Sequence, residues 1–226
     1  MLAPCLCSML LFFAGGAEGD PAALRDFTDF KLEELGVKLV TAKTDPKTHF
    51  QVGGKNSAAT IKGLTEINGV ELDQLEADMR PGKLSRAGFL GPNEKLLDIL
   101  AADNQYVVDK LGLTHQELAK HLHVLAAIGL WQGKHKETES PFRYHGRKFK
   151  VKIVSFRGFV RSPFDDQTKT NSEATLFNLD NGKELKYSLL VPHMIERYGF
   201  YEGKGTPYRV DPRKILETLD FLKKRR

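Results

Sequence analysis

Residues 148–153 read Lys-Phe-Lys-Val-Lys-Ile, and this stretch decides how the chain is classified. Apolar and basic side chains alternate in it with a period of two, which is the period at which side chains change faces along a β-strand. We therefore expect a strand with one apolar face and one basic face.

A hairpin is expected after this strand. Residues 174–179 and 183–190 alternate on both sides of the sequence Asp-Asn-Gly at 180–182. Asn-Gly tolerates the positive φ angles that tight hairpin turns require. A short helix over 192–199 and a final helix that opens at Asp211-Pro212 follow. The C-terminal half is thus predicted to be an antiparallel β-meander closed by short helices.

The preceding part of the chain has helical spacing instead. Residues 93–111 and 114–129 repeat apolar side chains at intervals of three and four, which is typical of amphipathic helices. Asn93 is expected to cap the first helix, and Thr114 with Glu117 matches a capping box for the second. The short connection between them predicts an αα-hairpin.

Shorter elements are expected near the N-terminus. Apolar residues between Leu24 and Leu35 have rough helical spacing, and Gly36 is expected to end that helix in a left-handed cap. We further expect a hairpin formed by 38–42 and 49–52, and short helices at 57–64 and 72–79. The predicted fold class is therefore α+β.

Composition changes divide the chain into four parts. These are a leader at 1–17, a helix-rich region at 18–131, a polar linker at 132–141 and a β-rich region at 142–226. Apolar residues on both faces around Leu176 and Phe177 predict a sheet that is covered on both sides. This favours one shared core, although two separate cores stay open.

The leader resembles a signal peptide. The chain carries no charged residue before Glu18, and the apolar run at 6–13 is too short to cross a bilayer as a helix. Small residues at 14–17 fit a cleavage site near Ala17. We expect a secreted or periplasmic, soluble protein with no transmembrane span. Because no Lys or Arg precedes the apolar run, an uncleaved leader in a cytoplasmic protein stays an alternative.

Cysteine and histidine usage bounds the chemistry. Both cysteines, Cys5 and Cys7, lie in the leader, so the mature chain would be cysteine-free and without disulfides or thiol catalysis. No motif for a cofactor is present, and none is expected. His121 and His123 are the closest histidine pair, but residues two apart in a helix point to different faces, so no metal site is expected.

Basic charge is concentrated in the second half of the chain. Between Lys134 and Arg161 there are nine basic residues against only Glu137 and Glu139. Such a stripe attracts anionic partners, among them anionic polymers and envelope components. The residues predicted to form this basic face are Lys148, Lys150, Lys152, Arg157 and Arg161.

A glycine-containing stretch near the C-terminus supplies a second candidate surface. Tyrosines alternate there with basic residues, and such a loop can bind sugars, bases or peptides by stacking and charge. The residues of this aromatic loop are Tyr198, Tyr201, Tyr208 and Arg209. Asp165-Asp166, after a proline and a phenylalanine, is interpreted as a solvated turn.

These features predict an exported, non-catalytic protein that binds an anionic or polymeric partner. A hydrolase with histidine and carboxylate chemistry is the alternative. It would be favoured if the fold brought two or more of the histidines at 49, 115, 121, 145 and 193 within ligand distance of one another, or of an Asp or Glu, in a cleft. A nucleic-acid-binding protein in the cytoplasm is a further alternative, which requires that the leader is retained.

Overall fold

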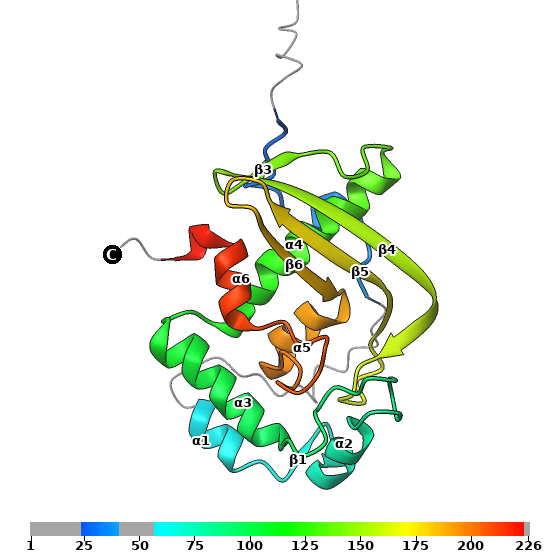
Figure 1. Cartoon of the computed structure of the whole chain (residues 1–226), viewed down its shortest axis with the longest axis vertical. Coiled ribbons are helices and arrows are strands. Elements are labelled where there is room, and N and C mark those ends of the chain that lie inside the picture. The colour runs from blue at the N-terminus through cyan, green and yellow to red at the C-terminus, as the bar shows by residue number, and fades with distance from the viewer. Residues whose placement is uncertain (1–23, 41–56, 224–226) are drawn as a thin grey trace, which may run out of the picture.

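The computed structural model describes residues 24–40 and 57–223, and in them helices combine with antiparallel sheets (Figure 1). This confirms the predicted α+β class. The elements are η1 (Leu32–Leu35), α1 (Ser57–Lys62), β1 (Glu66–Ile67), β2 (Val70–Glu71), α2 (Leu72–Asp78), α3 (Leu96–Asn104), η3 (Gln105–Lys110), α4 (His115–Lys134), β3 (Phe142–Tyr144), β4 (Arg147–Arg161), β5 (Lys169–Asn178), β6 (Lys183–Ser188), α5 (Leu190–Tyr198), α6 (Pro212–Thr218) and η4 (Asp220–Leu222).

The main sheet is the predicted meander. Its four strands pair antiparallel in the order β3-β4-β5-β6. Val151 lies opposite Leu176, which puts the apolar faces of β4 and β5 on the same side. Figure 1 shows β4 as a long strand that curves down one side of the molecule. The strand register therefore follows the alternation seen in the sequence.

Helix α4 covers the inner face of this sheet and joins the two halves of the chain into one core. Gly129 of α4 comes so close to β4 that a Cβ there would lie 2.6 Å from Cγ1 of Val151. The buried apolar residues of the helix-rich and β-rich regions form one continuous cluster. Buried and half-buried residues alternate along β5. The outer face of the sheet is therefore partly exposed, whereas we expected both faces to be covered. The shared core comes from α4, which extends to Lys134 and thus into the predicted linker.

The starts of α3 and α4 are capped in different ways. Thr114 Oγ1 accepts a hydrogen bond from the Glu117 amide at 3.0 Å, which confirms the predicted cap. The expectation for Asn93 was wrong, because α3 begins at Leu96 and its amide donates to Oε1 of Glu76 in α2 at 2.8 Å. The helices follow each other as predicted, but α3 contacts α1, whereas α4 contacts α5 and the sheet.

The N-terminal segment differs from the expected helix. Asp26 forms a parallel bridge with Arg143, and the Phe27 amide donates to the Arg143 carbonyl at 2.9 Å. The Phe27 ring is buried between Trp131 and Phe142. Pairing with β3 satisfies the backbone here without a helix. Between residues 24 and 35, the helical structure is the single 3₁₀ turn η1, and Gly36 after it adopts the predicted left-handed cap with φ 57°.

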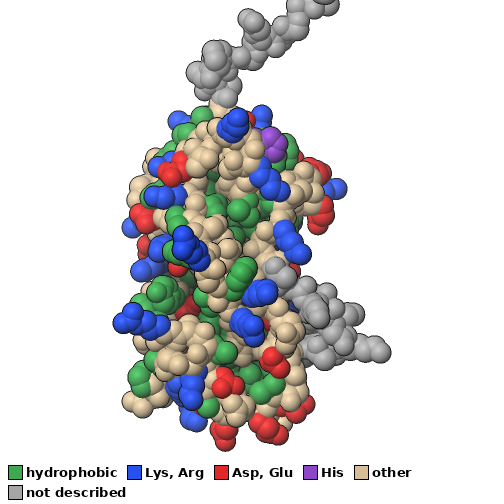
Figure 2. All heavy atoms as spheres, turned by 90° about the vertical axis from the view of Figure 1, so that its right-hand side faces the viewer, with side chains coloured by type: hydrophobic (Ala, Val, Ile, Leu, Met, Phe, Trp, Pro, Cys, Tyr) green, Lys and Arg blue, Asp and Glu red, His purple; other side chains and the backbone are tan. Residues whose placement is uncertain are grey.

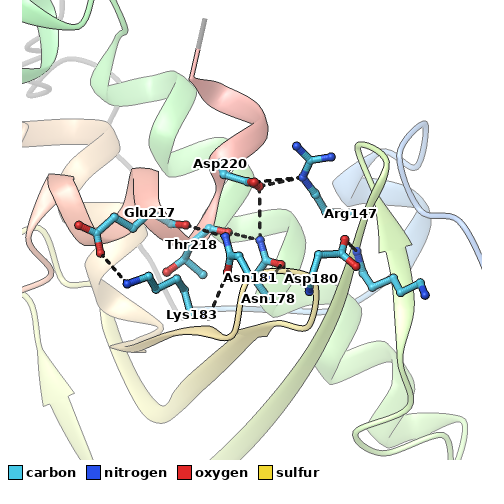
Figure 3. Close-up of polar contacts among 9 residues, drawn as sticks. Arg147, Asn178, Asp180, Asn181, Lys183, Glu217, Thr218 and Asp220 are labelled. Atoms are coloured by element: carbon cyan, nitrogen blue, oxygen red, sulfur yellow. Dashed lines mark hydrogen bonds and ion pairs between the residues drawn. The ribbon is translucent and has the colours of Figure 1, made fainter. Parts of the chain in front are cut away.

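The β5–β6 turn is tied to the C-terminal helix (Figure 3). Asn178 Nδ2 donates to the Thr218 carbonyl at 2.8 Å, and Asn181 Nδ2 donates to the Glu217 carbonyl at 3.0 Å. Carbonyl groups in the last turn of a helix have no partner within the helix, so these two amides satisfy them. The start of α6 is capped by Asp211, as the Asp-Pro sequence predicted.

Some sequence predictions fall outside the described residues. These are the leader, both cysteines and the expected strand at 49–52, whereas the helices expected at 57–64 and 72–79 are observed as α1 and α2. Among residues 24–40 and 57–223, no helix has the length and apolar character needed to cross a bilayer.

Candidate functional site

Four histidines line one cavity of about 820 Å³, which we call the histidine cavity. Its walls come from residues 28–40, from α4, from the turn between β3 and β4, and from α5. His121 and His123 lie on α4, His145 on the turn and His193 on α5. Although residues two apart in a helix face different directions, His121 and His123 both line this cavity, where His121 contacts Tyr144 and His123 contacts Glu196.

A buried aspartate orients one of these histidines. Nε2 of His193 lies 2.7 Å from Oδ2 of Asp166, and the two side chains are only 9% and 8% exposed. The same Oδ2 accepts a hydrogen bond from the Tyr198 hydroxyl at 2.8 Å, and Oδ1 accepts one from the Thr168 amide at 2.9 Å. The expectation of a solvated turn was therefore wrong for Asp166.

The charge state of Asp166 follows from these partners. Burial by itself opposes ionisation, but the hydrogen bond and positive charge of His193, with the donors of Thr168 and Tyr198, outweigh it and lower the pKa of Asp166 below its usual range. An ionised carboxylate can only accept hydrogen bonds. When the His193 ring is neutral, Nε2 must therefore carry its hydrogen, and Nδ1 then has the lone pair.

Tyr198 and Asn68 support the aspartate from behind. The Tyr198 ring stacks on Phe164 with centroids 3.8 Å apart, and Asn68 Nδ2 donates to both the Tyr198 hydroxyl and the Phe164 carbonyl at 2.8 Å. Burial, with the charge of Asp166, raises the pKa of Tyr198 well above its usual value, so its hydroxyl stays a donor. The Asp166 carboxylate is thus held in one orientation.

The remaining histidines of the cavity are neutral or paired. Burial lowers the pKa of His121 to about 4, with smaller effects of His145 and Lys120, and Nδ1 of His121 lies 2.8 Å from the Tyr144 hydroxyl. Burial also lowers the pKa of His145. The His121 and His145 rings meet edge to face at 5.2 Å. Neutral imidazoles can donate or accept hydrogen bonds with a substrate.

His123 is the member of the cavity with an unused polar atom. Its Nε2 lies 3.5 Å from Oε2 of Glu196, and its buried Nδ1 has no hydrogen-bond partner. The hydrogen bond from His123 is the main reason that the pKa of Glu196 is lowered. A buried polar atom without a partner is unusual in a folded protein, and this one lies below the surface of the cavity wall.

The cavity also contains fixed charge but no metal cluster. Lys120 and Arg197 bring positive charge to its lining, and Asp29 and Glu196 bring negative charge. In the part of the chain that the structure describes, no group of three or more His, Cys, Asp or Glu side chains could hold a metal ion.

The basic face lies along β4, away from this cavity. Lys148, Lys152, Arg157 and Arg161 are exposed, whereas Lys150 is half-buried, pairs with Glu139 at 3.4 Å and lies over the Phe177 ring. Figure 2 shows this side of the molecule, with Lys and Arg side chains spread over it and acidic side chains at its lower end and along its upper edges. The face is positive without being uniformly so.

The aromatic loop is divided between core and surface. Tyr198 and Tyr201 are fully buried, and Arg209 is turned inwards, where its Nη1 lies 3.0 Å from Oδ2 of Asp103. Tyr201 bonds to Nδ1 of His115 at 2.8 Å. Only Tyr208, which is 54% exposed, can offer its ring to a partner at the surface. Tyr198, Tyr201 and Arg209 therefore stabilise the interior in this structure.

The aspartate–histidine pair could not be found from sequence spacing. Asp166 follows β4 and His193 lies in α5, so the hairpin of β5 and β6 separates them in the chain. The sequence held one weak signal for burial of Asp166, which was the presence of apolar neighbours such as Phe164. The chain matches no protein-family model, no curated protein and no solved structure.

Proposed function

We propose that the protein is a hydrolase in which His193 acts as a general base inside the histidine cavity. The observation that carries this proposal is the 2.7 Å contact between Nε2 of His193, which lines that cavity, and the buried Asp166 carboxylate. A histidine held by a carboxylate is a recurrent arrangement for proton abstraction.

The chemistry follows from the hydrogen positions. In the neutral form of His193, Asp166 accepts the Nε2 hydrogen and Nδ1 presents its lone pair, and no described residue occupies Nδ1 with a hydrogen bond. A water molecule beside Nδ1 could transfer a proton to it and attack an ester carbon or phosphorus. The imidazolium that forms is stabilised by the negative Asp166. General-base catalysis of this kind contributes roughly 10²–10⁴-fold.

Other cavity residues suit the remaining parts of such a reaction. The attacked group gains negative charge in the transition state, and Lys120 and Arg197 supply positive charge in the lining. These groups favour esters or phosphoesters as the substrate class.

The test is hydrolysis of p-nitrophenyl acetate and bis(p-nitrophenyl) phosphate by the full chain. We expect turnover above that of free imidazole at equal concentration. His193→Asn should lower kcat about 10²-fold or more. Asp166→Asn should lower kcat with little change in KM, because Asp166 is a positioning residue. Lys148→Gln, on the basic face, should leave the rates unchanged.

The same measurements can reject the proposal. If His193→Asn hydrolyses both compounds as fast as the unchanged protein, another group is responsible. If neither compound turns over faster than with imidazole, the cavity does not perform this reaction on these substrate classes. Circular dichroism of each variant shows whether a lost rate comes from a lost fold.

The basic face supports a second, non-catalytic function, which is binding of an anionic polymer. Its specific support is the row of exposed Lys148, Lys152, Arg157 and Arg161, for which no ion pair is found among the described residues. Substituting Gln for Lys148, Lys150 and Lys152 together should lower the salt concentration at which the protein leaves a heparin column, because phosphate and sulfate contacts are screened by salt.

A charge-matched control separates this surface from overall charge. Lys83, Lys110 and Lys214 are exposed and lie outside β4. Their triple replacement by Gln removes the same charge and should shift elution less. Equal shifts in both triple variants, or no shift in either, would count against a binding role for the basic face.

A further inference from the structure

A second cavity, which we call the aromatic cleft, lies where the end of β4 meets the loops at 85–89 and 202–208. It has a volume of about 600 Å³ and shares no lining residue with the histidine cavity. Three of its rings, Phe156, Phe159 and Tyr208, are 50%, 57% and 54% exposed. Exposed apolar side chains that cluster around one hollow often mark an interaction site, whereas exposed apolar side chains that are scattered singly do not.

An irregularity in the sheet holds two of these rings at the cleft. The pairing of β4 with β5 shifts register between Ser155 and Val160, so the intervening residues have no ladder partner. Asn171 Nδ2 donates to the Phe156 carbonyl at 3.0 Å and fixes the irregular segment to β5. Such bulges change the direction of side chains at defined points. Phe156 and Phe159 are therefore placed by the backbone.

A buried carboxyl group lies in the wall of the same cleft. Glu202 is only 4% exposed, and its φ of 69° is in the left-handed region that residues other than glycine rarely adopt. Thr206 Oγ1 donates to its Oε2 at 3.3 Å. Burial raises the pKa of Glu202 to about 8, against smaller opposing effects of Thr206 and Arg209. At neutral pH the carboxyl group is mostly protonated.

Two of the other charged side chains around Glu202, those of Glu173 and Arg209, are already paired. Glu173 also lines the cleft and pairs with Lys186 at 2.7 Å. Arg209 donates to the backbone carbonyl of Glu202, while its guanidinium binds Asp103. Arg86 is the basic residue among the lining residues. The Glu202 carboxylate therefore has no salt bridge among the described residues.

We propose that the aromatic cleft binds a small organic cation with an apolar ring, its ammonium group at Glu202 and its ring against Phe159 and Tyr208. Aromatic faces attract cations, and a carboxylate supplies the opposite charge. An anion would meet two carboxyl groups, and a purely apolar molecule would leave Glu202 without a partner. The proposal does not depend on the hydrolase function of the histidine cavity.

Proton linkage gives this proposal a distinctive signature. A bound cation favours the ionised carboxylate, so binding must displace the proton that Glu202 holds at neutral pH. Affinity should therefore rise by up to about tenfold per pH unit below pH 8 and level off above it. Charges on Glu173, Arg86, Arg209 and Lys169, whose Nζ lies 5.1 Å from the centroid of the Phe159 ring, set the level of the affinity, but they do not supply this dependence.

The experiment compares three related probes by calorimetry on the full chain at pH 6.5 and pH 8.5. Tryptamine is a cation at both pH values, tryptophol is neutral, and indole-3-acetate is an anion. We expect tryptamine to bind most tightly, and at least fivefold more tightly at pH 8.5. Tryptophol should bind more weakly with little change between the two pH values, and indole-3-acetate should bind most weakly.

Variants assign the effect to the cleft. Glu202→Gln keeps the shape of the neutral side chain and should abolish the difference between the two pH values. Phe159→Ala and Tyr208→Ala, at exposed positions that the fold does not need, should each weaken tryptamine binding at least threefold. Leu179→Ala removes an exposed apolar side chain outside the cleft and should have no effect. His193→Asn should also bind tryptamine normally.

Each alternative outcome contradicts the proposal. Equal binding of tryptamine and tryptophol, or a preference for indole-3-acetate, would show that Glu202 does not select a cation. A pH dependence that persists in Glu202→Gln would assign it to another group. If Glu202→Gln does not fold, unchanged tryptamine binding by both Phe159→Ala and Tyr208→Ala would still reject the site.

Discussion

Nδ1 of His115 lies 2.8 Å from the Tyr201 hydroxyl, and both side chains are fully buried between the start of α4 and the segment after α5. Nε2 of His115 lies 3.3 Å from Oδ1 of Asn104. The neutral ring satisfies both contacts, because Nδ1 can accept from the tyrosine while Nε2 donates to the amide oxygen. Protonation would force Nδ1 to become a donor.

This contact predicts a loss of stability in mild acid. Burial lowers the pKa of His115 to about 4, below the usual value of about 6.5, so the unfolded chain binds more protons between these two values. Stability is therefore complete above pH 6.5 and decreases as the pH falls towards 4. The free energy of unfolding should drop by about 2 kcal/mol between pH 6.5 and 5 through this residue.

Urea denaturation at several pH values measures this effect. His115→Gln should lower stability at pH 7 and flatten the profile, although His121, whose pKa is also about 4, keeps part of the slope. His135→Gln, at an exposed histidine, is the control and should leave the slope as it is. An equally steep profile in His115→Gln would contradict the assignment.

A second prediction concerns two glycines of the same helix. A Cβ at Gly129 would lie 2.6 Å from Val151 and 3.0 Å from Ile153, so Gly129→Ala should destabilise the protein by about 1–3 kcal/mol through overpacking. A Cβ at Gly133 would meet nothing within 4 Å. Gly133→Ala should therefore stabilise the helix by up to about 1 kcal/mol. Thermal unfolding of both variants checks the opposite signs.

A third prediction concerns the amides of the β5–β6 turn. Asn178 is buried and donates to the Thr218 carbonyl, and its Oδ1 accepts from the Asp180 amide. Asn178→Ala would leave these buried groups without partners and should destabilise the protein by about 1–3 kcal/mol. Asn181→Ala, at an exposed site, should have a smaller effect. Equal losses of stability in the two variants would mean that burial does not determine how much each asparagine contributes to stability.

A fourth prediction concerns the leader. We propose that the protein is exported and that residues 1–17 are removed. N-terminal sequencing of the natural protein should then begin at or near Glu18. A natural protein that begins at Met1 would instead favour a cytoplasmic location and reopen nucleic acid as a partner.

Local signals in the sequence predicted most of the elements. The Thr114 cap, the Asp-Pro start of α6 and the period of two in β4 depend on neighbours in the chain, so they can be read without the fold. The N-terminal helix was wrong for the opposite reason. Asp26 and Phe27 pair with Arg143, and that distant strand offered the backbone a better partner than a helical turn.

The site depended even more on distant contacts. Glu76 caps α3 from α2, and Asp166 meets His193 only because β5 and β6 fold back between them. Burial also could not be predicted for single residues. Tyr198 and Tyr201 have basic neighbours in the sequence and were therefore expected at the surface, but both are buried. A pattern of residue types gives no distance between elements, so the candidate site became visible only in the fold.

The bridge between Asp26 and Arg143 affects how the chain can fold while it is being synthesised. Phe27 packs against Trp131 and Phe142, which leave the ribosome long after it does. At ordinary rates of translation this interval is on the order of ten seconds. During that time the ring has no binding site in its own protein, so chaperones that recognise apolar segments have their longest opportunity at this end of the nascent chain.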